Sequence, residues 1–131
     1  MIFVDTSAIY AILDGTDDNH ARASATWLKL LESGDPLVTT NYVAIECCAL
    51  AQRRLGLKAV RAIQAHVLPI MAFRWIDESI HAMAMNVLLA SNRTKLSLVD
   101  CTSFLVMKQM ELRTAFAFDR HFEQEGLLFP D

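Results

Sequence analysis

Two short apolar segments near opposite ends of the chain are each ended by an aspartate. Residues 2–4 are followed by Asp5, and residues 115–118 are followed by Asp119. Short, uninterrupted apolar runs are typical of buried strands in a parallel sheet. Since right-handed crossovers bring the carboxyl ends of parallel strands to one edge of the sheet, we expect Asp5 and Asp119 to lie together at that edge.

The segments between these two strands alternate between helical and strand patterns. Helices are expected over 8–13, 21–31, 42–55, 58–68, 80–89 and from 100 onward, and further strands over 37–40, 70–76 and 127–130. This alternation predicts an α/β fold, a three-layer α/β/α sandwich with a central, mostly parallel sheet, in one domain spanning residues 1–131. The segment 80–89 is apolar over much of its circumference, so it is expected to be central or covered by a partner.

Composition argues against several classes of protein. No apolar run approaches the roughly 18 residues of a membrane span, and the apolar start lacks a basic leader, so we expect neither a membrane segment nor a signal peptide. The three cysteines form no C-x-x-C pair, which argues against a zinc site or a disulfide framework and leads us to expect a reducing, cytoplasmic location. The net charge of −3 argues against nucleic-acid binding by bulk attraction. If four of the fifteen acids bind a cation, however, the other eleven are balanced by twelve Lys and Arg, so composition leaves a nucleic-acid substrate open.

Two further acids occupy helix positions where apolar residues are expected. Glu46 lies on the apolar face of the helix over 42–55, and Asp100 opens an apolar helix. An ionised carboxylate in apolar surroundings is costly unless its charge is compensated. Pairing with Arg53 would compensate Glu46, and N-capping would account for Asp100 and for Asp5. A shared bound cation is the alternative, and it would account for all four acids at once.

Four carboxylates on one rim repel one another, so either some are protonated or divalent cations neutralise them. No paired histidines or cysteines accompany them, and an all-oxygen site favours Mg²⁺ or Mn²⁺ over zinc. Such an ion holds a phosphate oxygen, activates a water and offsets charge in an in-line displacement. The reaction class indicated by these residues is therefore metal-assisted hydrolysis of phosphodiester bonds.

The order of the acidic motifs resembles that of a known family, the PIN-domain nucleases, and most closely the VapC-type toxins of toxin–antitoxin pairs. The motifs are Val4-Asp5-Thr6-Ser7, Glu46 in a helix, Leu98-Val99-Asp100 and Phe118-Asp119-Arg120-His121-Phe122. The resemblance covers essentially the whole chain. It implies a Mg²⁺- or Mn²⁺-dependent endoribonuclease acting on an RNA substrate, usually a homodimer, that a cognate antitoxin protein holds inactive.

The resemblance also implies a role for individual residues. The catalytic, metal-binding acids would be Asp5, Glu46, Asp100 and Asp119. Thr6 or Ser7 would orient Asp5 or a metal-bound water, while Arg120, Lys95 and Arg93 would either contact the RNA backbone or be solvated charges. Two positions depart from the family pattern and bear on rate and metal occupancy. Ala117 stands where Thr or Ser is common, and Cys101 replaces a small alanine.

Other functions remain compatible with parts of this pattern. A strand-end aspartate also serves haloacid-dehalogenase-like phosphatases, but these need a second Asp two residues later, where this chain has Ser7. A PIN-domain RNA-processing nuclease without a toxin role is a closer alternative. A non-catalytic PIN-like interaction module is another, although intact acids argue against it.

Overall fold

A parallel sheet forms the centre of the molecule in the computed structural model, which describes residues 1–125 and 129–130. Its strands are β1 (Ile2–Val4), β2 (Leu37–Thr40), β3 (Ala72–Arg74) and β4 (Ala115–Phe116), in the order β3-β2-β1-β4. All three pairings are parallel, with Phe3 beside both Val38 and Ala115. The predicted fold class is confirmed.

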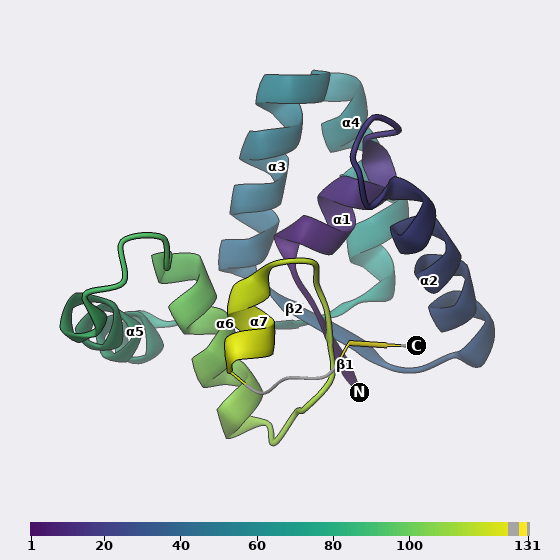
Figure 1. The fold of residues 1–131 in the computed structure, drawn as a ribbon. Helices are drawn as coiled ribbons and strands as arrows, with labels where there is room; N and C mark the ends of the chain where they lie inside the picture. Colours follow the sequence, from purple (N-terminus) through teal and green to yellow (C-terminus); the bar gives the residue numbers. More distant parts are fainter. Residues whose placement is uncertain (126–128, 131) are drawn as a thin grey trace.

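Helices cover both faces of this sheet (Figure 1). The helices are α1 (Thr6–Leu13), α2 (His20–Ser33), α3 (Asn41–Leu55), α4 (Leu57–Ala62), α5 (Glu78–Ser91), α6 (Leu98–Gln109) and α7 (Arg120–Gln124). The chain passes from β1 to β2 to β3 in one direction, so right-handed crossovers put α1–α4 on one face. It then returns across the sheet to β4, and this return carries α5 and α6 on the other face. Between β1 and β4 the direction of the strand order reverses, which is where ligands bind in open α/β sheets.

Several predicted elements differ from the structure in extent. The helix over 58–68 is α4 followed by a π-helical stretch, η1 (Ile63–Val67), and a 3₁₀ turn, η2 (Leu68–Ile70). Pro69 lies in that turn, where its missing N–H is tolerated, and β3 therefore starts only at Ala72. The strand over 115–118 ends at Phe116. In the expected strand over 127–130, residues 127 and 128 lie outside the described residues, and the two others are not in a strand.

The helix expected over 80–89 is α5, and its expected central position is wrong. Figure 1 shows α5 at the periphery, where it packs against α6. Met83, Val87 and Leu89 are exposed on it. The other expectation, that a partner covers the apolar outer surface of α5, stays a prediction. In the part of the chain that the structure describes, no helix is long and apolar enough to cross a membrane.

The sheet and the last helix share one aromatic core. Phe3 and Phe122 are both fully buried and their rings stack with centroids 6.4 Å apart. Phe104 of α6 meets Phe122 edge to face at 4.9 Å. These contacts fix α7 against β1 and α6, although α7 is too short to be stable alone. The hydroxyl of Thr39 donates to the carbonyl oxygen of Val4 at 2.9 Å, which fixes the end of β1 against β2.

Candidate active site

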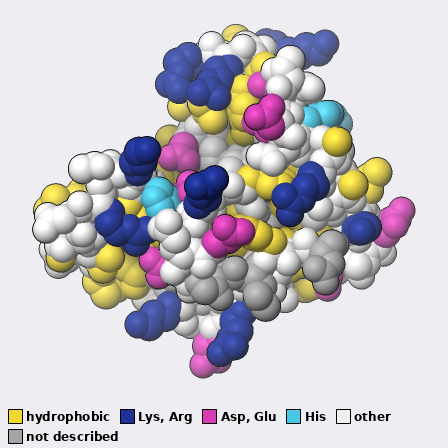
Figure 2. Space-filling model, viewed as in Figure 1, with side chains coloured by type: hydrophobic (Ala, Val, Ile, Leu, Met, Phe, Trp, Pro, Cys, Tyr) yellow, Lys and Arg dark blue, Asp and Glu magenta, His cyan; other side chains and the backbone are white. Residues whose placement is uncertain are grey.

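All four acids singled out in the sequence line one pocket at the carboxyl edge of the sheet. The pocket has a volume of about 300 Å³ and is lined by Asp5, Thr6, Ser7, Glu46, Leu50, Lys95, Ser97, Asp100 and Asp119. Figure 2 shows acidic side chains in a recess of this face, with Lys and Arg side chains standing around it. Local concentration of negative charge is thus built into a molecule whose other charges nearly balance.

Asp5 lies at the floor of the pocket because it ends β1 and caps α1. Its backbone is extended, and its Oδ2 accepts hydrogen bonds from the Ser7 N–H at 3.1 Å and from the Ser7 hydroxyl at 2.7 Å. Only 3% of Asp5 is exposed. Asp5 is therefore the N-cap of α1, as the sequence suggested. Capping does not explain why its carboxylate is buried in a pocket with three other acids. A cap alone is normally found in a solvated position.

The side chain of Ser7 connects the segment that carries Asp5 to the segment that carries Asp119. Besides donating to Asp5, its hydroxyl accepts a hydrogen bond from the Phe118 N–H at 2.9 Å. Phe118 follows the end of β4, so its N–H is bound by this side chain next to Asp119. Asp119 then caps α7, and its Oδ1 accepts from the His121 N–H at 2.9 Å.

Asp100 reaches the pocket from the first turn of α6. The N-cap is Ser97 rather than Asp100, and the two form a capping box: the Ser97 hydroxyl accepts from Asp100 N–H at 3.0 Å, and Asp100 Oδ2 accepts from Ser97 N–H at 3.2 Å. Asp100 is 7% exposed. Its backbone-facing bonds explain its orientation but not its burial beside three other carboxylates.

Glu46 enters the pocket from α3, one face of which packs on α1. The Thr6 hydroxyl donates to the Val43 carbonyl oxygen at 3.4 Å across these two helices. Among the described residues no ion pair joins Glu46 to Arg53, and Arg53 is exposed. The Glu46–Arg53 ion pair considered from the sequence is therefore not found, and Arg53 does not compensate the charge of Glu46.

Burial and neighbouring charges raise the pKa values of three carboxyl groups in the pocket. Burial raises the pKa of Asp5 from 3.8 to about 7, opposed by the Ser7 hydrogen bonds and increased by the charges of Asp100 and Glu46. Burial is also the main cause that raises the pKa of Glu46, with Thr6 opposing it. The pKa of Asp100 is raised by burial and by Asp119, against the Ser97 hydrogen bonds. Asp5, Glu46 and Asp100 are thus held where a negative charge is unfavourable.

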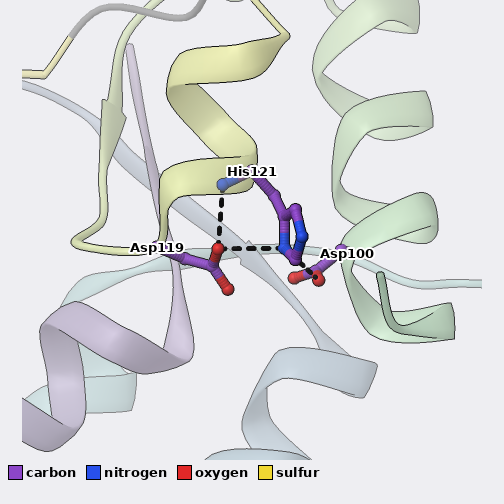
Figure 3. A group of neighbouring side chains, drawn as sticks. All are labelled: Asp100, Asp119 and His121. Atoms are coloured by element: carbon purple, nitrogen blue, oxygen red, sulfur yellow. Dashed lines mark hydrogen bonds and ion pairs between the residues drawn. The ribbon is translucent and has the colours of Figure 1, made fainter. Parts of the chain in front are cut away.

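His121 is a member of the site that spacing along the sequence does not predict. Its ring lies between two carboxylates in Figure 3, with Nδ1 3.3 Å from Asp100 Oδ2 and 3.0 Å from Asp119 Oδ1. Ligand atoms of these three residues all lie within 4.8 Å of one another. The direction of the ring depends on how α7 docks against Phe3 and Phe104, and the sequence alone does not give that docking.

The three basic residues expected to contact RNA have different positions. Lys95 lines the acidic pocket. Arg93 instead donates to Gln124 Oε1 at 2.7 Å and pairs with Glu125 at 3.5 Å, which ties the loop before α6 to α7. Arg120 is exposed on α7. Of the three, Lys95 is the one that lines the pocket of the four acids.

The donor set fits a divalent cation. Several carboxylate oxygens converge in one pocket, burial raises the pKa of three of the four carboxyl groups, and a cation would stabilise their charged forms. Carboxylate oxygens are the ligands that Mg²⁺ and Mn²⁺ prefer. A buried ring nitrogen, Nδ1 of His121, has no hydrogen-bond partner within the described residues and lies beside two of the carboxylates. The residues that would hold an ion are therefore Asp5, Glu46, Asp100 and Asp119.

The two positions that depart from the family pattern lie close to this site but outside the pocket lining. Ala117 is buried just before Phe118. The hydroxyl that position 117 lacks has a counterpart in Ser7, which holds the Phe118 N–H. Cys101 is buried behind Asp100, where it lines a separate groove between α5 and α6.

Comparisons with known proteins agree with this geometry. A family model described as PIN domain matches residues 2–126. Curated relatives include the 23S rRNA-specific endonuclease VapC20 of Mycobacterium tuberculosis, from strains CDC 1551 / Oshkosh and ATCC 25618 / H37Rv. Each is 32% identical over 130 residues, which cover 98% of this chain and 96% of the relative.

Solved structures show the same likeness in three dimensions. The crystal structure of Mycobacterium tuberculosis VapC20, a sarcin–ricin loop cleaving toxin, matches with a TM-score of 0.85 and 31% identity, covering 98% of this chain and 97% of that one. FitAcB from Neisseria gonorrhoeae matches with a TM-score of 0.68 over 100% of this chain and 97% of that one. At 20% identity this second likeness concerns the fold alone.

Proposed function

The chain belongs to the PIN-domain family, and from this we propose that it is an endoribonuclease that hydrolyses RNA phosphodiester bonds with a divalent cation, Mg²⁺ or Mn²⁺. The resemblance seen in the sequence is confirmed by the family model and by the VapC20 relatives. We further propose that the protein is the toxin of a toxin–antitoxin pair. This choice rests on likeness to VapC20 over nearly the whole of both chains.

One observation supports the catalytic proposal above all others: four carboxylates share a single pocket at the strand-order reversal between β1 and β4. Asp5 and Asp119 come from the two strands that flank this point, and Asp100 and Glu46 face it from helices on opposite faces of the sheet. Such an arrangement costs stability in the absence of a cation, because Asp5, Glu46 and Asp100 lose hydration beside like charges. A functional cation explains why the cost is maintained.

The chain's own residues would divide the work as follows. Asp5, Glu46, Asp100 and Asp119 bind the cation, which when bound polarises the phosphate, activates water and offsets developing negative charge. Ser7 holds Asp5 in one orientation through its hydroxyl. Lys95, at the pocket wall, would contact a phosphate of the RNA backbone.

The substrate class follows from the relatives. VapC20 is described as specific for 23S rRNA and as cleaving the sarcin–ricin loop. We propose a structured ribosomal RNA loop as the first substrate to test for this chain. The pocket is small and presents acids and one lysine, so recognition beyond the scissile phosphate would fall to the surface around it.

We propose two protein partners, a cognate antitoxin and a second copy of the chain. The exposed apolar residues of α5, Met83, Val87 and Leu89, are a surface that either partner would cover. The proposed compartment is the cytoplasm, which fits three free cysteines, Cys47, Cys48 and Cys101.

The proposal is tested with purified, antitoxin-free protein and two RNAs, intact 23S rRNA and a sarcin–ricin loop oligonucleotide. Cleavage is expected with Mg²⁺ or Mn²⁺ and is expected to stop with EDTA or with Asp100→Asn. Asp18→Asn, which changes an exposed acid outside the pocket, is the matched control and should remain active. Induced expression with transcriptome-wide mapping of cut sites would then identify the cellular target. The proposal fails if the protein binds no divalent ion and if Asp100→Asn changes no activity toward RNA.

A further inference from the structure

We propose that His121 is an additional metal ligand, and that Nδ1 of His121 with Asp100 and Asp119 forms a mixed nitrogen–oxygen site that prefers Mn²⁺ to Mg²⁺. This inference rests on the proposed function, since it concerns the cation of the same pocket. It goes beyond it by adding a nitrogen donor to a set of carboxylates and by assigning the ion.

The distances between the donor atoms suit one ion. Nδ1 lies 3.0 Å from Asp119 Oδ1 and 3.3 Å from Asp100 Oδ2. Ligands bound at about 2.1 Å and at right angles to one another are separated by roughly 3.0 Å, and at a tetrahedral angle by roughly 3.4 Å. Both observed distances fall in this range. The ligand atoms of all three side chains lie within 4.8 Å of one another, so the three residues are grouped closely enough to share a cation.

Hydrogen bonding accounts less well for the same contacts. Nδ1 is shielded from solvent, yet within the described residues it has no partner in hydrogen-bond geometry, despite the two nearby carboxylate oxygens. A hydrogen bond needs an acceptor close to the axis of the ring nitrogen. Ligands that share an ion lie off that axis, because the ion itself occupies it. The positions of the two carboxylate oxygens around His121 Nδ1 are those expected of ligands that share an ion.

The two oxygens are held in place before any ion arrives. Asp100 Oδ2 also accepts the Ser97 N–H at 3.2 Å, and Asp119 Oδ1 also accepts the His121 N–H at 2.9 Å. Each oxygen has a further lone pair for a cation. The backbone that carries the imidazole is also fixed, because Phe122, the next residue, is fully buried against Phe3 and Phe104. Preorganised donors lose little freedom on binding, which favours affinity.

A nitrogen donor changes which ion the site prefers. Mg²⁺ is a hard cation that takes oxygen ligands and keeps much of its water. First-row transition ions accept imidazole as well as carboxylate, and Mn²⁺ is the one among them best suited to a set rich in carboxylates. One imidazole beside Asp100 and Asp119 should therefore raise the affinity for Mn²⁺ more than that for Mg²⁺.

The test is pulsed electron paramagnetic resonance of Mn²⁺ bound to the full chain, together with calorimetric titrations of Mn²⁺ and Mg²⁺. The wild type is expected to show coupling of Mn²⁺ to a nitrogen nucleus. His121→Ala should remove this coupling and lower the Mn²⁺ affinity at least tenfold. His121→Asn puts an amide oxygen close to the place of Nδ1, so it should lose the coupling, recover part of the affinity and lower the ratio of Mn²⁺ to Mg²⁺ affinity. His66→Gln, at an exposed position, is the control and should leave all three measurements unchanged.

The outcomes separate the proposed role of His121 from the proposed nuclease function. Tight Mn²⁺ binding by the wild type without nitrogen coupling would overturn the role of His121, and would leave the carboxylate site and the proposed nuclease intact. Coupling that persists in His121→Ala would assign the nitrogen to another residue and overturn it equally. If the wild type binds neither ion, the proposed function itself fails. Because the coupling is measured first on the wild type, the result does not depend on how well a variant folds.

Discussion

The hydroxyl of Ser7 accepts a hydrogen bond from the backbone N–H of Phe118 at 2.9 Å, although the two residues are 111 positions apart in the sequence. The same hydroxyl donates to Asp5 at 2.7 Å. One small side chain thus sets the orientation of the first acid and the path of the chain toward the last one. The Phe118 N–H that Ser7 binds directly follows Ala117, the position at which the family resemblance implies Thr or Ser.

Replacing Ser7 by Ala should therefore affect both stability and catalysis. The change leaves the Phe118 N–H without a partner and removes one of the two hydrogen bonds that Asp5 Oδ2 accepts, which costs about 1–3 kcal/mol in the free energy of unfolding. Divalent-ion affinity should fall as well, because Asp5 is no longer held in one orientation. Denaturant unfolding and ion titration measure the two effects. Ser33→Ala removes an exposed hydroxyl with only local bonds and should change neither by more than about 0.5 kcal/mol.

The raised pKa of Asp5 predicts how stability depends on pH in the metal-free protein. Burial raises this pKa to about 7 in the folded state, against 3.8 for an unperturbed carboxyl group. Between these values the folded state keeps a proton that the unfolded state has lost, so the free energy of unfolding falls as pH rises from about 4 to about 7. The fall attributable to Asp5 is at most about 4 kcal/mol.

Asp5→Asn isolates this contribution. Asparagine keeps the helix cap but carries no charge, so the variant should lose less stability over the same pH range and be more stable than the wild type at neutral pH in EDTA. Urea unfolding at several pH values gives the difference between the two proteins. Parallel curves for both would show that Asp5 does not carry an unfavourable charge in the folded state.

A divalent cation should reverse this penalty. Mn²⁺ at about one hundred times its dissociation constant would stabilise the folded state by about 2.7 kcal/mol, provided that the unfolded chain does not bind it. Thermal unfolding with Mn²⁺ and with EDTA measures the effect as a shift in Tm. The shift should nearly vanish in Asp100→Asn. An equal shift in this variant would place the ion elsewhere.

Lys95→Ala should weaken RNA binding rather than the chemical step. Because Lys95 stands at the wall of the pocket, its loss should raise KM more than it lowers kcat, and reduce the slope of log affinity against log salt by about 1. Lys95→Arg should restore most of the affinity. Lys58 is exposed on α4 outside the pocket, so an equal effect of Lys58→Ala would mean that only general charge matters.

Phe122→Ala should destabilise the fold by about 3–5 kcal/mol. The ring is fully buried between Phe3 and Phe104, and it anchors the helix that carries Asp119 at its cap. Phe122→Leu keeps most of the buried volume and should cost less. The folded fraction of Phe122→Ala should also bind divalent ions more weakly, which ion titration below its unfolding temperature would measure. Equal stability of the two variants would contradict the packing argument.

The convergence of the four acids could be predicted because it depends only on the parallel direction of the strands and on helix periodicity. Two short apolar runs ended by Asp5 and Asp119 indicate parallel strands, and parallel strands share a carboxyl edge. The helix positions of Glu46 and Asp100 follow from periodicity. None of these inferences requires knowledge of how side chains pack.

The features that could not be predicted all depend on packing between distant segments. The place of His121 depends on how a short helix docks onto Phe3 and Phe104, and no sequence period reports that docking. The pairing of Arg93 with Gln124 and Glu125 depends on the same docking. The position of α5 could not be chosen from the sequence for a related reason: an apolar helix has the same sequence pattern whether the core or a partner covers it, and the structure excludes only the central position.

The pairing of β1 with β4 also makes the site depend on segments that lie far apart in the sequence. Asp5 and Ser7 follow β1, whereas Phe118 and Asp119 follow β4, so neither segment alone supplies the whole pocket. A fragment that ends before Phe118 keeps β1 and α1 but lacks both Asp119 and the N–H that Ser7 accepts. Such a fragment should therefore not form the complete site.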